Sequence, residues 1–138
     1  MAIQNEPGAR IFHGFEQPLR EVENHFDIPG ITRHLLLDNR MLQEKSFHIA
    51  VHHITGSYVP TNTHCSAHTH DFDEINLLIS ETETLVYEYK LNGVVEAVKS
   101  PACIYIPAGV EHYSKAILGT GMLVCIRLDH QPKKTAES

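Results

Sequence analysis

The feature that most constrains the fold is a series of short apolar runs, broken by turn residues, in the last two-thirds of the chain. The runs cover residues 46–58, 64–70, 74–80, 84–91, 94–99, 102–107, 112–117 and 121–128. The gaps between them are too short for the helices that connect parallel strands. Several runs are apolar on both faces, so we expect both faces to be covered. This pattern predicts an all-β fold of antiparallel strands, arranged as a sandwich or barrel.

Turn signals divide the chain into three parts. Asn92-Gly93 separates two of the runs and is a strong hairpin signal. Residues 1–45 are punctuated by proline and glycine, with a short helix expected over 19–26 and a helix or strand over 32–43. We predict an N-terminal extension (1–45) that packs on the barrel, a β domain (46–129) and a frayed tail (130–138). The extension would add an edge strand, cover a barrel mouth or exchange with a partner chain.

Composition excludes several classes of partner. The chain has 138 residues, a net charge of −6 and no basic stripe, which argues against binding to nucleic acid or an anionic membrane. No stretch is long and apolar enough to span a membrane, and the N-terminus lacks the pattern of a signal peptide. Three cysteines (Cys65, Cys103 and Cys125) without CxxC spacing fit reduced thiols. We therefore expect a cytoplasmic protein of one domain.

Histidine is unusually common, with eleven residues, and two of them begin a distinctive motif. His68 and His70 are two residues apart, so an extended chain places both imidazoles on one side. Glu74 has the same parity and could bring its carboxylate toward the pair. Two neutral nitrogens and one anionic oxygen suit a catalytic divalent metal that keeps open positions.

A second motif lies some forty residues further on, in the stretch PAGVEH. Pro107 ends a strand-like run, Gly109 permits a tight turn, and His112 opens the next run. Such a turn delivers a third imidazole at the start of a strand.

Together, the two motifs resemble those of the cupin superfamily, HxHx(3–4)E followed by PxGxxH. The resemblance covers about residues 47–128 and implies an antiparallel jelly-roll β-barrel, with a short N-terminal helix or extended segment before it. It also implies that His68, His70, Glu74 and His112 bind one divalent metal per chain, with Zn, Fe, Mn and Ni as the candidates. Four outer motif positions, which shape turns, depart from the family pattern: Asn62, Glu81, Pro101 and Ala116.

Further polar residues are candidates for roles around the metal. His64 shares the parity of His68, and Asn76 follows Glu74 at strand period, so both are candidate catalytic or supporting groups. His52 and His53 are adjacent, so at most one faces the cavity; we take His53 as the candidate. Arg127 lies in an apolar run and needs a carboxylate from the protein or from an acidic substrate. Tyr87 and Tyr105 are candidate substrate contacts if they are not packing residues, and Asp71 and Asp73 are expected at the rim.

Three functional hypotheses follow from these residues and from the resemblance. The first is a metalloenzyme of specialised metabolism, in which the metal acts as a Lewis acid for isomerisation, lyase, cyclisation or condensation chemistry on a small molecule. The second is an Fe(II)- and O2-dependent dioxygenase or oxidase of a small acidic or phenolic substrate. The third is a non-catalytic module that binds a small ligand. The resemblance also implies a homodimer.

Overall fold

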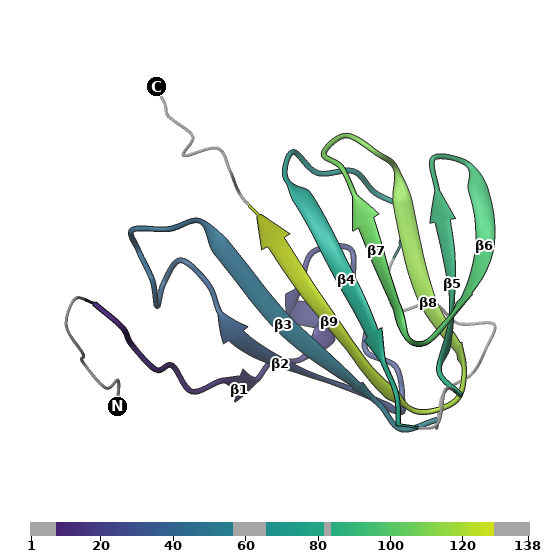
Figure 1. The fold of residues 1–138 in the computed structure, drawn as a ribbon, viewed down its shortest axis with the longest axis horizontal. Coiled ribbons are helices and arrows are strands. Elements are labelled where there is room, and N and C mark those ends of the chain that lie inside the picture. The colour runs from purple at the N-terminus through teal and green to yellow at the C-terminus, as the bar shows by residue number, and fades with distance from the viewer. Residues whose placement is uncertain (1–7, 57–65, 82–83, 129–138) are drawn as a thin grey trace.

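The protein is built from two antiparallel β-sheets, seen in the computed structural model, which describes residues 8–56, 66–81 and 84–128 (Figure 1). The elements in chain order are β1 (Phe15–Glu16), the 3-10 helix η1 (Leu19–Glu21), β2 (Ile31–Leu37), β3 (Phe47–Ile54), β4 (Asp73–Ile79), β5 (Val86–Leu91), β6 (Val94–Lys99), β7 (Ala102–Ile106), β8 (His112–Leu118) and β9 (Gly121–Leu128). The prediction of an antiparallel jelly-roll fold is confirmed.

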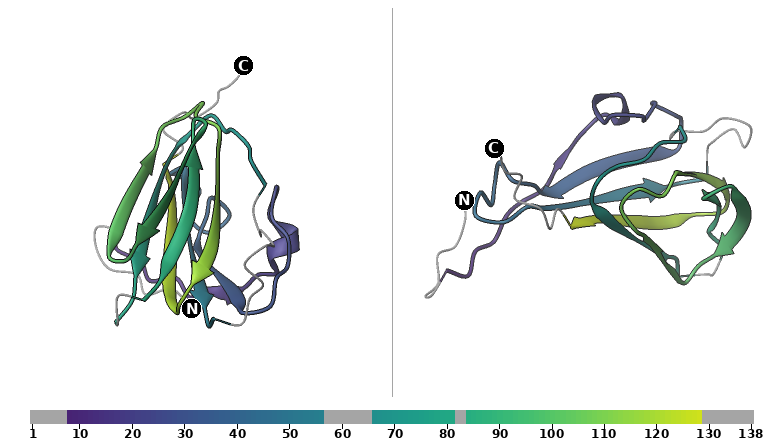
Figure 2. Two further views of the ribbon diagram at one scale, coloured as in Figure 1. Left: turned by 90° about the vertical axis from the view of Figure 1, so that its right-hand side faces the viewer. Right: turned by 90° about the horizontal axis from the view of Figure 1, so that it is seen from above.

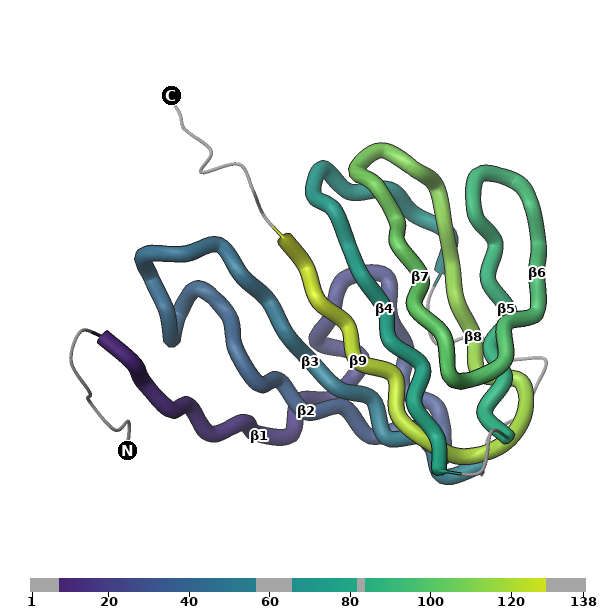
Figure 3. The backbone as a smooth tube through the Cα atoms, in the orientation of Figure 1, coloured from purple at the N-terminus to yellow at the C-terminus, as the bar shows by residue number. Residues whose placement is uncertain are grey.

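The larger sheet has the order β1-β2-β3-β9-β4-β7, and the smaller has the order β6-β5-β8. The last strand, β9, therefore lies between β3 and β4, as the tube in Figure 3 shows. Strand pairing among the described residues does not close the two sheets into one hydrogen-bonded barrel. A single bridge between His68 and His112 links the segment before β4 to β8.

The core lies between the two sheets and is made by alternate residues of their strands. Its members include Ile54, Leu78, Leu85, Tyr87, Tyr89, Ile104, Ile106 and Leu123. Tyr87 and Tyr89 stand two residues apart on β5 and are fully buried, with ring centroids 5.9 Å apart. Since side chains alternate between faces along a strand, the period of two fixes which residues face this core.

The N-terminal segment contributes strands to the larger sheet. Strand β2 pairs with β3 from Ile31↔Ile54 to Leu37↔Ile49, across the boundary that we expected at residue 45. The stretch 32–43 therefore begins as a strand. The helix expected over 19–26 is reduced to the one turn of η1, because Val22 is extended and Asn24 has a φ of 66°. Figure 2 shows η1 beside the strands and outside both sheets.

The run at 64–70 also differs from expectation. Its described part is an extended segment with one bridge at His68, and regular strand begins only at Asp73. An extended backbone still places alternate side chains on one side, so the spacing of His68 and His70 retains its meaning. Within the described ranges, no helix has the length and apolar character needed to cross a membrane.

Candidate metal centre

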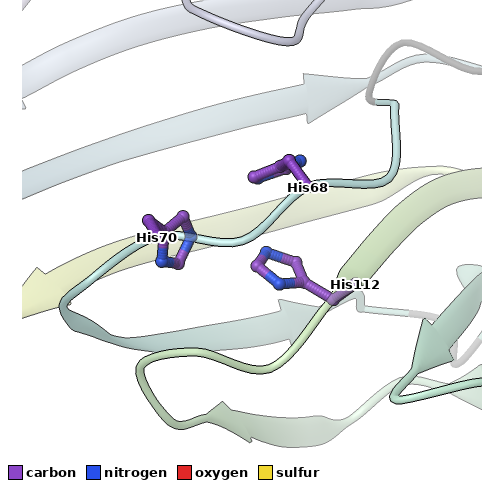
Figure 4. Close-up of side chains that lie close together, drawn as sticks. All are labelled: His68, His70 and His112. Carbon is purple, nitrogen blue, oxygen red and sulfur yellow. The ribbon is translucent and has the colours of Figure 1, made fainter.

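Three imidazoles converge at one end of the space between the sheets. One ring nitrogen from each of His68, His70 and His112 lies within 4.8 Å of the other two (Figure 4). The ring centroids of His68 and His112 are 4.5 Å apart, and those of His70 and His112 are 4.8 Å apart. His68 and His70 come from the segment before β4, and His112 comes from the first residue of β8.

Each ring is oriented in the same way, through its Nδ1 atom and a nearby backbone carbonyl. The Nδ1 of His68 lies 2.5 Å from the oxygen of Ser66, and the Nδ1 of His112 lies 2.9 Å from that of Val110. The contact of His70 with Phe72 is longer, at 3.3 Å. In His68 and His112, a proton on Nδ1 makes Nε2 the atom that would bind a metal, which is the usual arrangement of metal-binding histidines. His70 instead donates from Nε2 to Glu74, so it would have to release that proton to bind a metal.

Glu74 supplies a carboxylate to the same group. Its Oε1 atom is 2.9 Å from the Nε2 of His70 and 3.9 Å from the Nε2 of His112. Burial alone would raise the pKa of Glu74. Hydrogen bonds from His70 and Asn76, with the positive charge of Arg127, outweigh burial and lower that pKa to about 2. The carboxylate is therefore ionised at neutral pH.

The second oxygen of Glu74 is held from inside the protein. The amide of Asn76 donates to Oε2 at 2.8 Å, and the hydroxyl of Tyr89 donates to the Oδ1 of Asn76 at 2.8 Å. The thiol of Cys125 also donates to Oε2, at 3.4 Å. Burial raises the pKa of Cys125 to about 12, so this group remains a thiol. Asn76 thus orients Glu74, on the side where we expected it.

The two sequence motifs are tied together by hydrogen bonds. His68 and His112 exchange a pair of backbone hydrogen bonds, each 3.0 Å long. The amide of Gly109 donates to the carbonyl of His70 at 2.9 Å, and the amide of Ala108 donates to Oδ1 of Asp73 at 2.9 Å. Gly109 has a φ of +87°, which glycine adopts without strain. Asp73 therefore holds the turn that delivers His112.

The candidate ligands line two hollows that share some of their residues. The inner cavity is narrow, about 20 Å³, and is lined by His25, Arg33, His52, His68, Glu74, Asn76, His112, Ser114, Leu123, Cys125 and Arg127. The outer pocket, of about 100 Å³, is lined by Glu23, Asn24, His68, Thr69, His70, Phe72 and Arg127. His68 and Arg127 belong to both. A molecule in the outer pocket would meet the candidate ligands His68 and His70, and the volume of this pocket suits only a small molecule.

Arg33 occupies the floor of the inner cavity and is 2% exposed. Its guanidinium donates to Oε1 of Gln17 at 2.9 Å, to Nε2 of His52 at 3.0 Å and to Nε2 of His48 at 2.8 Å. All three acceptors are uncharged when the imidazoles are neutral. Burial lowers the pKa of Arg33 to about 10 and, with the two arginine charges, the pKa of His48 to about 4.

Arg127 and Phe72 complete the wall beside His70. The ring of Phe72 stacks on that of His70, and the guanidinium of Arg127 lies 5.3 Å from the centroid of Phe72. Neither contact had a signal in the sequence, because each depends on how the segment before β4 folds against β9.

Three predicted site residues lie elsewhere. His52, not His53, faces the cavity, because the register of β3 with β2 pairs His52 with the inward-facing Arg33; the ring of His53 instead meets that of His34 at 5.3 Å. Tyr105 is 57% exposed, since Ile104 and Ile106 take the inward positions of β7. Tyr87 is buried in the core and does not line the inner cavity or the outer pocket.

His64 lies outside the described residues. The residues that sequence reasoning missed are Arg33, His25, Phe72 and Tyr89. His25 lines the inner cavity, and burial lowers its pKa to about 4.

Comparison with solved structures identifies the architecture. A 12% identical RmlC-like cupin from Shewanella frigidimarina matches with a TM-score of 0.50, over 77% of this chain and 86% of its own. The chain has the cupin fold. Hydroxypropylphosphonic acid epoxidase from S. wedmorenis is 12% identical, with a TM-score of 0.59 over 93% of this chain and 63% of that chain. The polyketide cyclase RemF from Streptomyces resistomycificus is 16% identical, with a TM-score of 0.53 over 77% and 70%.

At these identities the likeness concerns the fold alone. No family model and no curated protein matches the sequence. Function must therefore be argued from the residues that this cupin fold brings together.

Proposed function

We propose that the protein is an enzyme that binds one divalent metal through His68, His70, Glu74 and His112 and acts on a small molecule. The observation that carries this proposal is the convergence of three imidazole nitrogens within 4.8 Å, beside a buried carboxylate. Neutral nitrogens with one anionic oxygen suit Zn, Fe, Mn or Ni. The carbonyl contacts of Nδ1 and the hydrogen bond from Asn76 fix the donors in advance.

The chemistry that we favour is non-redox. When bound, the metal would polarise a carbonyl or carboxylate of the substrate as a Lewis acid, for isomerisation, lyase, cyclisation or condensation chemistry. His25 and His52 are the cavity imidazoles outside the candidate ligand set. His52 accepts a hydrogen bond from Arg33 at Nε2, which holds this nitrogen unprotonated. The low pKa of His25 keeps its ring neutral, so it would take up a proton only transiently.

Two alternatives use the same site. The set of three histidines and one glutamate also suits Fe(II), and hydroxypropylphosphonic acid epoxidase, described as an FeII protein, has the same fold. An O2-dependent oxidation of a small acid is therefore the second candidate. The third is a metal-bound ligand site without catalysis. The two hollows leave room for a small ligand in each case.

Metal analysis tests the proposal. Protein purified without chelator, and protein reconstituted with Zn(II), Fe(II), Mn(II) or Ni(II), should bind one equivalent of metal. His68→Ala and His112→Ala should lose it. His53→Ala is the matched control, because this ring lies on the other face of β3 against His34, and it should retain full occupancy. Anaerobic assays against a metabolite panel then separate Lewis-acid chemistry, which persists, from oxidation, which stops.

The proposal is wrong if folded parent protein binds none of the four metals, or if His68→Ala and His112→Ala bind metal as the parent does.

We also propose a homodimer, formed through the outer face of the larger sheet. Paired apolar rows cross this face, away from Glu74. One row aligns Ile49, Ile126, Ile75 and Tyr105, and the next aligns Val124, Leu77 and Cys103. A second copy would cover these rows. Light scattering should give twice the chain mass of 15.6 kDa; a monomeric mass at micromolar concentration would rule the dimer out.

A further inference from the structure

Arg127 reaches the cavity with a buried donor that has no partner. Its Nε atom is shielded from solvent and makes no hydrogen bond to the described part of the chain. No ion pair joins its guanidinium to a described carboxylate, although Glu23 lines the same outer pocket. The side chain as a whole is half-buried, but a shielded donor without a hydrogen bond still costs about 1–3 kcal/mol. The missing partner points to an anion from outside the chain.

The charges around the inner cavity point the same way. Two guanidinium groups, Arg33 and Arg127, face one carboxylate, Glu74. The guanidinium of Arg33 donates to Gln17, His48 and His52, and none of these three residues carries a negative charge. A divalent metal on Glu74 would engage that negative charge as well. The cavity therefore has an excess of positive charge before a substrate binds.

Arg127 also stands in the right place to meet a substrate. It lines both the inner cavity and the outer pocket, next to His68, which belongs to both as well. A molecule in the outer pocket would therefore lie against Arg127 and against the candidate metal ligands His68 and His70 at once. The contact with the face of Phe72, which lines the same pocket, holds the guanidinium there. The planar fork of arginine matches the two oxygens of a carboxylate.

We propose that the protein binds a small carboxylate substrate, with the carboxylate on Arg127 and the adjoining functional group toward His68, His70 and His112. Arg33 contributes its charge from behind, and the pocket volume of about 100 Å³ limits the substrate to a few non-hydrogen atoms. This inference deepens the proposed function and rests on it for the reacting group, but the carboxylate contact itself needs no metal.

Binding of glycolate and of its neutral isostere glycolamide tests the proposal. The titration is followed by NMR of the arginine Nε–H signals in 15N-labelled protein, first without metal and then with Zn(II). We expect glycolate to shift the Arg127 signal and to bind at least tenfold more tightly than glycolamide in both states. Arg127→Gln should abolish the preference for glycolate and retain the metal stoichiometry. Glu23→Gln, an exposed control in the same pocket, should keep the preference or increase it.

Four results would overturn the inference. One is equal binding of glycolate and glycolamide, and another is a preference that survives in Arg127→Gln. The third is loss of metal from folded Arg127→Gln, which would make Arg127 a support of Glu74. Inorganic phosphate is the comparison anion: if it binds at Arg127 and glycolate does not, the carboxylate assignment is wrong. Failure of the proposed metal site would look different, because metal-free protein would still prefer glycolate.

Discussion

The ring of Phe72 lies flat against the ring of His70, with centroids 4.0 Å apart and planes inclined by only 9°. The same phenyl ring has the guanidinium of Arg127 at 5.3 Å. One aromatic side chain therefore fixes a candidate metal ligand and the proposed carboxylate-binding residue at once.

Replacing Phe72 by leucine should weaken both functions. The stacking interaction contributes about 0.5–1.5 kcal/mol to holding His70 in its orientation. Its loss corresponds to a roughly 2- to 10-fold weaker affinity for Zn(II). Competition with a chromophoric chelator measures this affinity, and Phe15→Ala, a change at a half-exposed phenylalanine of β1, is the control. Equal Zn(II) affinity in Phe72→Leu and the parent would show that the stack does not support His70.

Asn76→Leu should lower both metal affinity and stability. Asn76 is 2% exposed, and its side chain bonds to Oε2 of Glu74 and to the hydroxyl of Tyr89. The change to leucine removes both hydrogen bonds. Unpaired buried polar groups cost about 1–3 kcal/mol, and outer partners of ligands typically change metal affinity about 10- to 100-fold. Urea unfolding and Zn(II) titration measure the two effects.

Tyr89→Phe is the matched variant for Asn76→Leu. This variant removes the hydrogen bond from Tyr89 to Asn76 and keeps the one from Asn76 to Glu74. Stability should therefore fall by about 1 kcal/mol, while most of the Zn(II) affinity remains. A larger loss of metal from Tyr89→Phe than from Asn76→Leu would contradict this order.

Stability should fall as the pH drops from about 6.5 toward 4. The pKa of His48 is lowered to about 4 in the folded protein by burial and by the charges of Arg127 and Arg33, and burial likewise lowers the pKa of His25 to about 4. The ordinary pKa of histidine in an unfolded chain is about 6.5. Between these values the unfolded state binds more protons, so acid favours it. Above pH 6.5 this contribution is fully present.

His48→Gln isolates the part played by His48. Its amide oxygen can still accept from Arg33, but it cannot titrate. The proton uptake on unfolding, obtained from denaturation at several pH values in metal-free protein, should decrease by close to one proton near pH 5. An unchanged proton uptake would mean that His48 titrates normally in the folded state.

Gly109→Ala should disturb the turn that delivers His112. No atom lies within 4 Å of an added Cβ, so the cost comes from the φ of +87° and amounts to about 1–2 kcal/mol. Gly93→Ala is a close control, with a φ of +89° and equally open space in the hairpin between β5 and β6. Both variants should lose similar stability, but only Gly109→Ala should also lose Zn(II) affinity. Equal Zn(II) affinity in the two variants would show that the conformation of this turn does not affect the metal site.

The sequence predicted the parts of the site that depend on local spacing. His68, His70 and Glu74 are near neighbours in the sequence, and the turn at Gly109 was predicted from its own residues, although contacts with His70 and Asp73 also hold that turn in place. Most of the strands after residue 46 and their antiparallel arrangement were equally accessible from the short apolar runs, but the run at 64–70 is not a regular strand and the order of the strands was not predicted.

The remaining contacts depend on pairing between distant segments. Arg33 meets His52 only because β2 and β3 align these two residues, and a shift of one position would have brought in His53. Tyr105 pointed outward for the same kind of reason, since parity along β7 is set by Ile104 and Ile106. No local pattern in the sequence could have settled such a register.

The central place of β9 has a consequence for how the protein is made. The four candidate ligands all precede this strand in the chain, but the sheet between β3 and β4 stays divided until β9 has been synthesised. During synthesis, the edges of β3 and β4 that pair with β9 therefore stay unpaired until β9 emerges from the ribosome. Cys125 and Arg127, which lie on β9, are the last residues to join the cavity. Insertion of β9 between β3 and β4 then completes the larger sheet, and we expect its long sequence separation from β3 to slow this step.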